Sequence, residues 1–168
     1  MDADALKSLQ APLKEKYRAD PSAALITLRA EGRASEGIAC KVATGRAVVA
    51  AGLHPATGGD GSLACSGDML LEALVACAGV TLRAVATAIG VELRDATIVA
   101  EGDLDFRGTL GVSKEAPVGF TAIRLRFTLD TSATDEQCTT LIRLTERFCV
   151  VLQTLLVPAA ISVEKSRV

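Results

Sequence analysis

A long Ala- and Leu-rich stretch from Met69 to Ile89 constrains the fold more than any other feature of this sequence, because only Glu72 and Arg83 interrupt it with charge. Ser66 is a suitable N-cap and Gly90 a suitable terminator, so the pattern predicts one long helix between them. A helix that is apolar almost all round must be buried on several sides. We therefore expect it at the centre of the fold, and we expect a homodimer because one small sheet cannot cover it.

Alternating apolar and polar residues predict two long antiparallel strands after this helix, over 97–106 and 123–129, each exposed on one face. The other expected elements are strands over 24–30, 38–43 and 47–51, a helix from Thr134 to about Phe148, and an edge strand through Ala160, Ser162 and Glu164. This order predicts an α+β fold in which an antiparallel sheet packs on the long buried helix.

The beginning of the chain has a different pattern. Apolar residues at spacings of three and four over 3–18 predict a helical arm, with Pro12 producing a kink or a second short helix. We therefore expect an N-terminal helical extension over 1–20, followed by one domain over 21–168.

The charge balance excludes several classes of partner. Lys and Arg number 18 against 20 for Asp and Glu, a formal net charge of −2, so there is no basic field to bind a nucleic acid. Aromatic residues make up 3% of the chain, too few for a base-stacking platform. The first residues do not pair a basic segment with an apolar one, so we expect a soluble, unexported, cytoplasmic protein without a membrane anchor.

Five cysteines and one histidine set the limits on the chemistry. The cysteines are Cys40, Cys65, Cys77, Cys138 and Cys149. Their odd number and the lack of a C-x-x-C pair fit functional thiols in a reducing compartment better than a disulfide framework. A single histidine excludes a multi-histidine metal site, and we expect no metal or other cofactor. From spacing alone, Cys77 and Cys149 are two buried thiols.

A Gly-rich loop precedes the long helix and carries the one histidine, His54. The loop has four glycines and a proline over 52–61, yet it is not a phosphate loop, because no Gly-Lys-Ser/Thr follows. The segments 58–61 (GGDG) and 66–77 (SGDMLLEALVAC) resemble the OsmC/Ohr family pattern, in which a Gly-rich loop runs into a helix with the motif P-x-E-L-L-x-x-A-L-x-x-C. The segment 145–149 (TERFC) is similar to a second family motif around a cysteine.

The resemblance covers roughly 23–166. It implies an OsmC-like fold, an intertwined homodimer with active sites at the dimer interface, and a thiol-dependent peroxidase of organic hydroperoxides. By the same resemblance, Cys77 attacks the peroxide, Cys149 resolves the sulfenic acid as a disulfide, and an external dithiol reduces that disulfide.

The family also places an arginine beside the reactive cysteine, held by a carboxylate at the start of the helix, and Asp68 aligns with that carboxylate. Asp68 precedes Cys77 by nine helical residues, about 13 Å, so the two can meet only across a dimer or through a long arginine side chain. No arginine lies between Arg46 and Cys77, which leaves Arg33, the preferred candidate, and Arg46. Val150 stands where the family has proline.

Other readings of these residues stay open. Cys65 is an alternative resolving thiol or a plain loop cysteine, and His54 is a turn residue or part of the peroxide pocket. Asp68 can simply complement the helix dipole, and Arg33 can be an exposed hairpin arginine. As a whole, the chain could instead be a redox-responsive OsmC-like dimer without efficient peroxidase activity, or a structural dimer with inert cysteines.

Overall fold

The computed structural model describes residues 48–111 and 113–167 in full, the backbone of 31–35 and 39–43, and residues 2, 4, 5, 8, 11 and 19. The helical arm expected over 3–18 lies outside the described residues apart from these few. The strand expected over 24–30 lies outside them entirely. The boundary between an extension and a main domain near residue 20 therefore stays a prediction.

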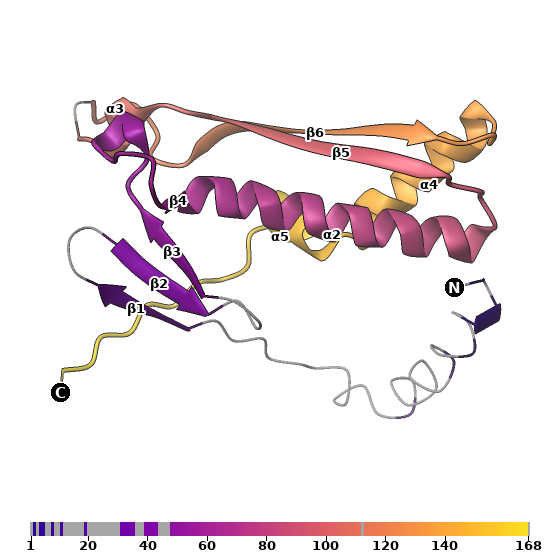
Figure 1. Ribbon diagram of the computed structural model, residues 1–168, viewed down its shortest axis with the longest axis horizontal. Coiled ribbons are helices and arrows are strands. Elements are labelled where there is room, and N and C mark those ends of the chain that lie inside the picture. The colour runs from indigo at the N-terminus through magenta and orange to yellow at the C-terminus, as the bar shows by residue number, and fades with distance from the viewer. Residues whose placement is uncertain are drawn as a thin grey trace.

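The described elements form two sheets around one long helix (Figure 1). In chain order they are β1 (Glu31–Ser35), β2 (Ala39–Ala43), β3 (Val48–Gly52), the 3₁₀ turn η2 (Pro55–Thr57), β4 (Ala64–Cys65), α2 (Ser66–Ile89), β5 (Asp95–Leu104), α3 (Phe106–Thr109), β6 (Phe120–Asp130), α4 (Asp135–Phe148) and α5 (Val150–Leu156). One sheet has the order β1-β2-β3-β4, in which β4 pairs parallel to β3 and the other pairs are antiparallel. The second sheet is the antiparallel ribbon β5–β6. The predicted α+β class is confirmed.

Helix α2 has the predicted length, with a start that differs by one position. Cys65 is the N-cap, with extended backbone and no side-chain capping bond, and Ser66 is the first helical residue. The prediction of Ser66 as the cap was therefore wrong by one residue. At the other end, Gly90 adopts the left-handed conformation, with φ of 71°, and its N–H binds the carbonyl oxygens of Ala86 and Thr87. Glycine fits there because it has no Cβ to clash.

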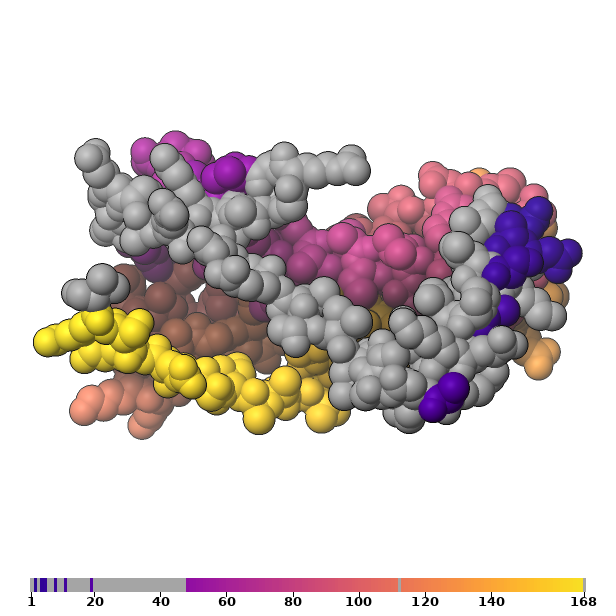
Figure 2. Space-filling view, turned by 90° about the horizontal axis from the view of Figure 1, so that it is seen from below, coloured from indigo at the N-terminus to yellow at the C-terminus, as the bar shows by residue number. Residues whose placement is uncertain are grey.

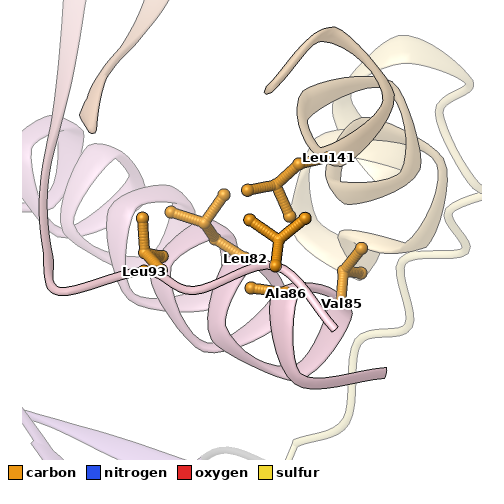
Figure 3. Close-up of a cluster of buried hydrophobic side chains, with 6 residues drawn as sticks. Leu82, Val85, Ala86, Leu93 and Leu141 are labelled. Atoms are coloured by element: carbon orange, nitrogen blue, oxygen red, sulfur yellow. The ribbon is translucent and has the colours of Figure 1, made fainter. Parts of the chain in front are cut away.

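The core lies along one face of α2. Its buried residues recur at helical spacing and are Leu74, Ala78, Leu82, Val85 and Ala86. Around Leu82 they pack against Leu93, after the helix, and Leu141 of α4 (Figure 3). The β5–β6 ribbon runs along the length of α2 and supplies the other wall of the core (Figure 1). Val80, on another face of the helix, is 73% exposed, so burial on several sides is not seen within one chain.

Length and composition alone would also allow α2 to cross a membrane. The core helices of folded domains pass the same test. Here the apolar residues of the buried face are explained by their packing against β5, β6, α4 and α5.

The two long strands after α2 form as predicted, with different bounds: β5 (Asp95–Leu104) begins two residues earlier than expected, and β6 (Phe120–Asp130) begins three residues earlier and ends one later. Strand β5 ends at Leu104, and Phe106, which was expected to continue the strand, begins the short helix α3. The reason is Asp105, whose carboxylate caps α3 by accepting the Arg107 N–H at 3.1 Å. On the outer face of the ribbon, four side chains form what we term the charge ladder. They are Glu101 and Asp103 of β5 and Arg124 and Arg126 of β6, joined by ion pairs.

Helix α4 begins as predicted, since the Thr134 hydroxyl accepts the Gln137 N–H at 3.3 Å and the Gln137 side chain accepts the Thr134 N–H at 2.9 Å. This reciprocal capping box satisfies two amides at the helix start. Beyond α5, the segment 157–167 is extended and exposed (Figure 2). The edge strand expected through Ala160, Ser162 and Glu164 does not form, because no other strand of the described chain pairs with this segment.

Candidate functional site

Two cysteine thiols from distant parts of the sequence lie together where α4 and α5 pack against α2. Cys77 is midway along α2, and Cys149 lies at the junction of α4 and α5. They pack with Leu74 and Ala78 in one apolar cluster. Cys149 is fully buried, whereas Cys77 is half-buried and so remains partly accessible. The structure thus brings together the two cysteines that the resemblance singled out, with both thiols free.

The helix junction places Cys149. Its N–H donates to the Thr145 carbonyl oxygen at 2.9 Å and closes α4, while its own carbonyl oxygen accepts the Gln153 N–H at 2.9 Å and opens α5. The sequence reading missed α5 altogether. Proline after this cysteine would have signalled a helix start, because proline is favoured at the first helical position, but Val150 stands there.

The surroundings of Cys77 favour its thiolate. Burial of the thiol raises the pKa of Cys77, but hydrogen bonds from the Val151 and Val150 amides, the Cys149 thiol and the Thr81 hydroxyl outweigh that penalty. The net effect is a pKa below the ordinary value for cysteine. Donors that stabilise the charged form lower an acid's pKa, and a lowered pKa is what makes a thiol nucleophilic near neutral pH.

The pKa of Cys149 shifts in the opposite direction. Burial raises the pKa of the Cys149 thiol most, and the Leu152 amide opposes it. The hydrogen bond to Cys77 and the negative charge of Cys77 raise the pKa further, so the net shift is upward. Of the two thiols, Cys77 is therefore the more acidic and Cys149 the less acidic. The more accessible sulfur is thus also the more nucleophilic one.

The structure does not bring the predicted carboxylate, Asp68, to Cys77 within one chain, and it does not describe the side chains of the two candidate arginines. Asp68 lies exposed in the first turn of α2 and lines a recess with Glu72, nine residues and about 13 Å of helix from Cys77. The backbone of Arg33 lies in β1, paired with Lys41 of β2, and its side chain lies outside the description. Arg46 lies outside the described residues.

Cys65 is too far along α2 to resolve Cys77 in the same chain, because twelve helical residues span about 18 Å. It lines a cavity together with His54, away from the thiol pair. Cys138 is half-buried on α4, and Cys40 lies in β2. Among the residues that the structure describes, no cluster of three or more His, Cys, Asp or Glu side chains is placed to hold a metal ion.

Comparison with known proteins agrees with this geometry. The family described as OsmC-like protein matches residues 59–164, well over half of the chain. The structure is similar to an OsmC-like protein from Mycoplasma pneumoniae, at 14% identity and a TM-score of 0.67 over 79% of this chain and 89% of that one. No curated protein sequence matches the chain.

Two further similar structures are named organic hydroperoxide resistance proteins. The one from Elizabethkingia anophelis has 15% identity and a TM-score of 0.63 over 80% of this chain and 91% of that one. The one from Legionella pneumophila, also called a predicted redox protein, has 17% identity and a TM-score of 0.61 over 78% of this chain and 90% of that one. At such identities the likeness concerns the fold.

Proposed function

The chain belongs to the OsmC-like family, and we propose that it is a thiol-dependent peroxidase that reduces organic hydroperoxides to alcohols. The observation that supports this most is the contact between Cys77 and Cys149, in which the accessible thiol has the lowered pKa and the buried thiol the raised one. The names of the Elizabethkingia and Legionella structures agree with the proposal.

The proposed reaction has three balanced steps. The Cys77 thiolate attacks the outer oxygen of R–O–OH, the O–O bond breaks, and Cys77 becomes a sulfenic acid while RO⁻ takes a proton and leaves as the alcohol. The Cys149 thiol then attacks the sulfenic sulfur, so that an S–S bond forms and water leaves. An external dithiol finally reduces this disulfide by thiol exchange and is itself oxidised to a disulfide.

The surroundings of the thiol pair indicate an apolar substrate. Aliphatic side chains of β5, β6 and α5 pack around Cys77 and Cys149, among them Ile98, Leu125 and Leu152. Each methylene that an alkyl peroxide buries against such a surface is worth about 0.8 kcal/mol, or about fourfold in affinity. Hydrogen peroxide gains nothing from it, so cumene hydroperoxide should react faster.

We also propose the homodimer that the family resemblance implies. Ala73, Ala76 and Val80 form an exposed strip at spacings of three and four on α2, away from the core face. A second copy of the chain would cover this strip, and it could bring Arg33 or Arg46 and Asp68 to the partner's thiol. Val80→Asp should then shift the protein toward monomers in sedimentation, because it places a charge inside the proposed interface. The fold of the single chain should tolerate the change, since Val80 is exposed there.

Peptide mapping after stoichiometric cumene hydroperoxide tests the peroxidase. We expect a Cys77–Cys149 disulfide in the native chain. Cys149→Ser should complete one turnover and then accumulate Cys77 sulfenic acid or its overoxidised forms, Cys77→Ser should consume no peroxide, and Cys138→Ser is the matched control with native turnover. A chain whose Cys77 stays reduced would rule out the enzyme. A disulfide that forms without turnover would favour the redox-responsive dimer instead.

The activating charge is tested separately. Arg33→Met and Arg46→Met should each be compared with Arg126→Met, which removes an exposed arginine of the charge ladder. If the proposed role is right, one of the first two variants slows peroxide reduction strongly while the dimer persists and the control keeps the native rate. Equal rates in all three would leave the amides, the hydroxyl and the Cys149 thiol around Cys77 as its activating groups.

A further inference from the structure

A cavity of about 340 Å³ lies at the N-terminal end of α2, apart from the thiol pair. It is open to solvent on one side and is lined by the turn η2, the first residues of α2, helix α3 and the adjoining ends of β5 and β6. Its volume is near the lower limit of small-molecule sites, which span about 300–1,000 Å³. Cys65, on its wall, is about 18 Å of helix away from Cys77.

The walls of this cavity are mostly apolar and aromatic. Leu104, Phe106 and Phe120 contribute hydrocarbon and ring surface, and Leu53 adds to it. Among the described residues that line it, none carries a carboxylate, an ammonium or a guanidinium group. Such a site favours uncharged ligands, because burying an unpaired ion against apolar walls is costly.

One polar ring in the wall is held in a defined orientation. The His54 ring stacks on Phe106 with ring centres 4.9 Å apart and an interplanar angle of 17°. Its Nδ1 accepts the Ala56 N–H at 3.0 Å, so in the neutral ring the hydrogen is on Nε2. Nε2–H is therefore a donor on a ring that stacking and a backbone bond fix in place, and it suits a ligand with an acceptor oxygen.

We propose that this cavity binds an uncharged, largely apolar small molecule that carries one hydrogen-bond acceptor, of the class of monocyclic aromatic ketones. The aromatic walls receive the ring, and the His54 Nε2–H donates to the carbonyl oxygen. The site does not depend on the proposed peroxidase, because Cys77 and Cys149 take no part in it.

Gly67 gives a way to fill the cavity without disturbing the fold. A Cβ built there would lie 3.5 Å from Phe120, 3.6 Å from Cys65 and 3.8 Å from Leu104, all ordinary contact distances to residues of the cavity wall. An alanine therefore fits, and a leucine would extend into the space the ligand needs. Gly79, also on α2, is the matched control, since its Cβ would meet Ile98 at 3.6 Å, outside the cavity.

The test uses acetophenone as the probe and the Cys65 thiol as the reporter. Saturating acetophenone should slow alkylation of Cys65 by N-ethylmaleimide several-fold in peptide mapping, with the rate at Cys138 unchanged. Benzoate, which has the same ring and a negative charge, should give no protection. Cys77→Ser should bind acetophenone as the native chain does, which separates this site from the peroxidase.

The variants then locate the ligand. Gly67→Ala should weaken acetophenone binding about fourfold, the equivalent of one displaced methylene at about 0.8 kcal/mol. Gly67→Leu should abolish it, and Gly79→Ala should leave it unchanged. If Gly67→Leu fails to fold, Gly67→Ala still decides. No protection of Cys65 in the native chain, equal protection by benzoate, or unchanged affinity in Gly67→Ala would overturn the proposal.

Discussion

Shortening Leu82 to alanine should destabilise the protein by several kcal/mol. Leu82 of α2 is fully buried, and it packs against Leu141 of α4 (Figure 3). The substitution removes three carbon atoms, worth about 2.4 kcal/mol of transfer free energy. The cavity that remains adds to this, and fully buried Leu→Ala changes cost about 2.7–5.0 kcal/mol. We therefore expect a loss of about 3–4 kcal/mol in the free energy of unfolding.

Leu70→Ala on the same helix is the matched control. Leu70 is 37% exposed, so scaling the transfer term by its buried share predicts a loss of about 1.5 kcal/mol without a closed cavity. Urea unfolding followed by far-UV circular dichroism should show a midpoint lowered by about 1–2 M for Leu82→Ala, with an unchanged slope. All three proteins are compared at one concentration, since dimerisation would make the midpoint concentration-dependent.

The comparison has a clear refuting result. If Leu82→Ala cost less than Leu70→Ala, the core would not lie on the α2 face that contacts α4. If Leu70→Ala alone lost additional stability on dilution, that residue would belong to the proposed dimer interface.

The lowered pKa of Cys77 predicts that its iodoacetamide rate rises with pH with a midpoint below 9.0, the ordinary cysteine value; a midpoint at or above that value would contradict the arrangement of donors. Below its folded pKa the thiol is protonated, so the rate should fall there. Thr134→Ala breaks the capping box of α4 and should cost about 1 kcal/mol in urea unfolding, and no loss would mean that the cap is not stabilising. Gly59→Ala should lower the melting temperature strongly, because its Cβ would lie 1.8 Å from the Leu53 carbonyl oxygen. Gly79→Ala, with 3.6 Å of room, should not lower it, and similar melting temperatures for the two would refute this reasoning.

The spacing of apolar residues was enough to predict those elements that bury one face against other parts of the same chain. The apolar stretch ending at Gly90 predicted α2, and alternation predicted β5 and β6, because each buries one face against the others. Local side-chain bonds were harder to foresee. Asp105 diverts the chain into α3, although alternation continues to Phe106, because a capping carboxylate competes with the strand.

The candidate site could be predicted only in part. The contact between Cys77 and Cys149 depends on how α5 packs beside α2. The spacing of residues along the sequence does not predict that packing. Resemblance to a family supplied the pair, whereas two of the donors that lower the pKa of Cys77 are backbone amides of α5, a helix that the sequence did not predict. Backbone groups leave no residue-type signal.

The charge ladder on the β5–β6 ribbon has a consequence for how copies of this protein behave at high concentration. Among the described residues β5 and β6 pair only with each other, so each strand has an edge that no other described strand covers and that another chain could extend. The outer face carries carboxylates on β5 and guanidinium groups on β6, paired across the strands as the charge ladder, and stacking a second ribbon there would bury these ion pairs at a net cost. The four side chains of the charge ladder thus oppose amyloid-like stacking of one ribbon on another.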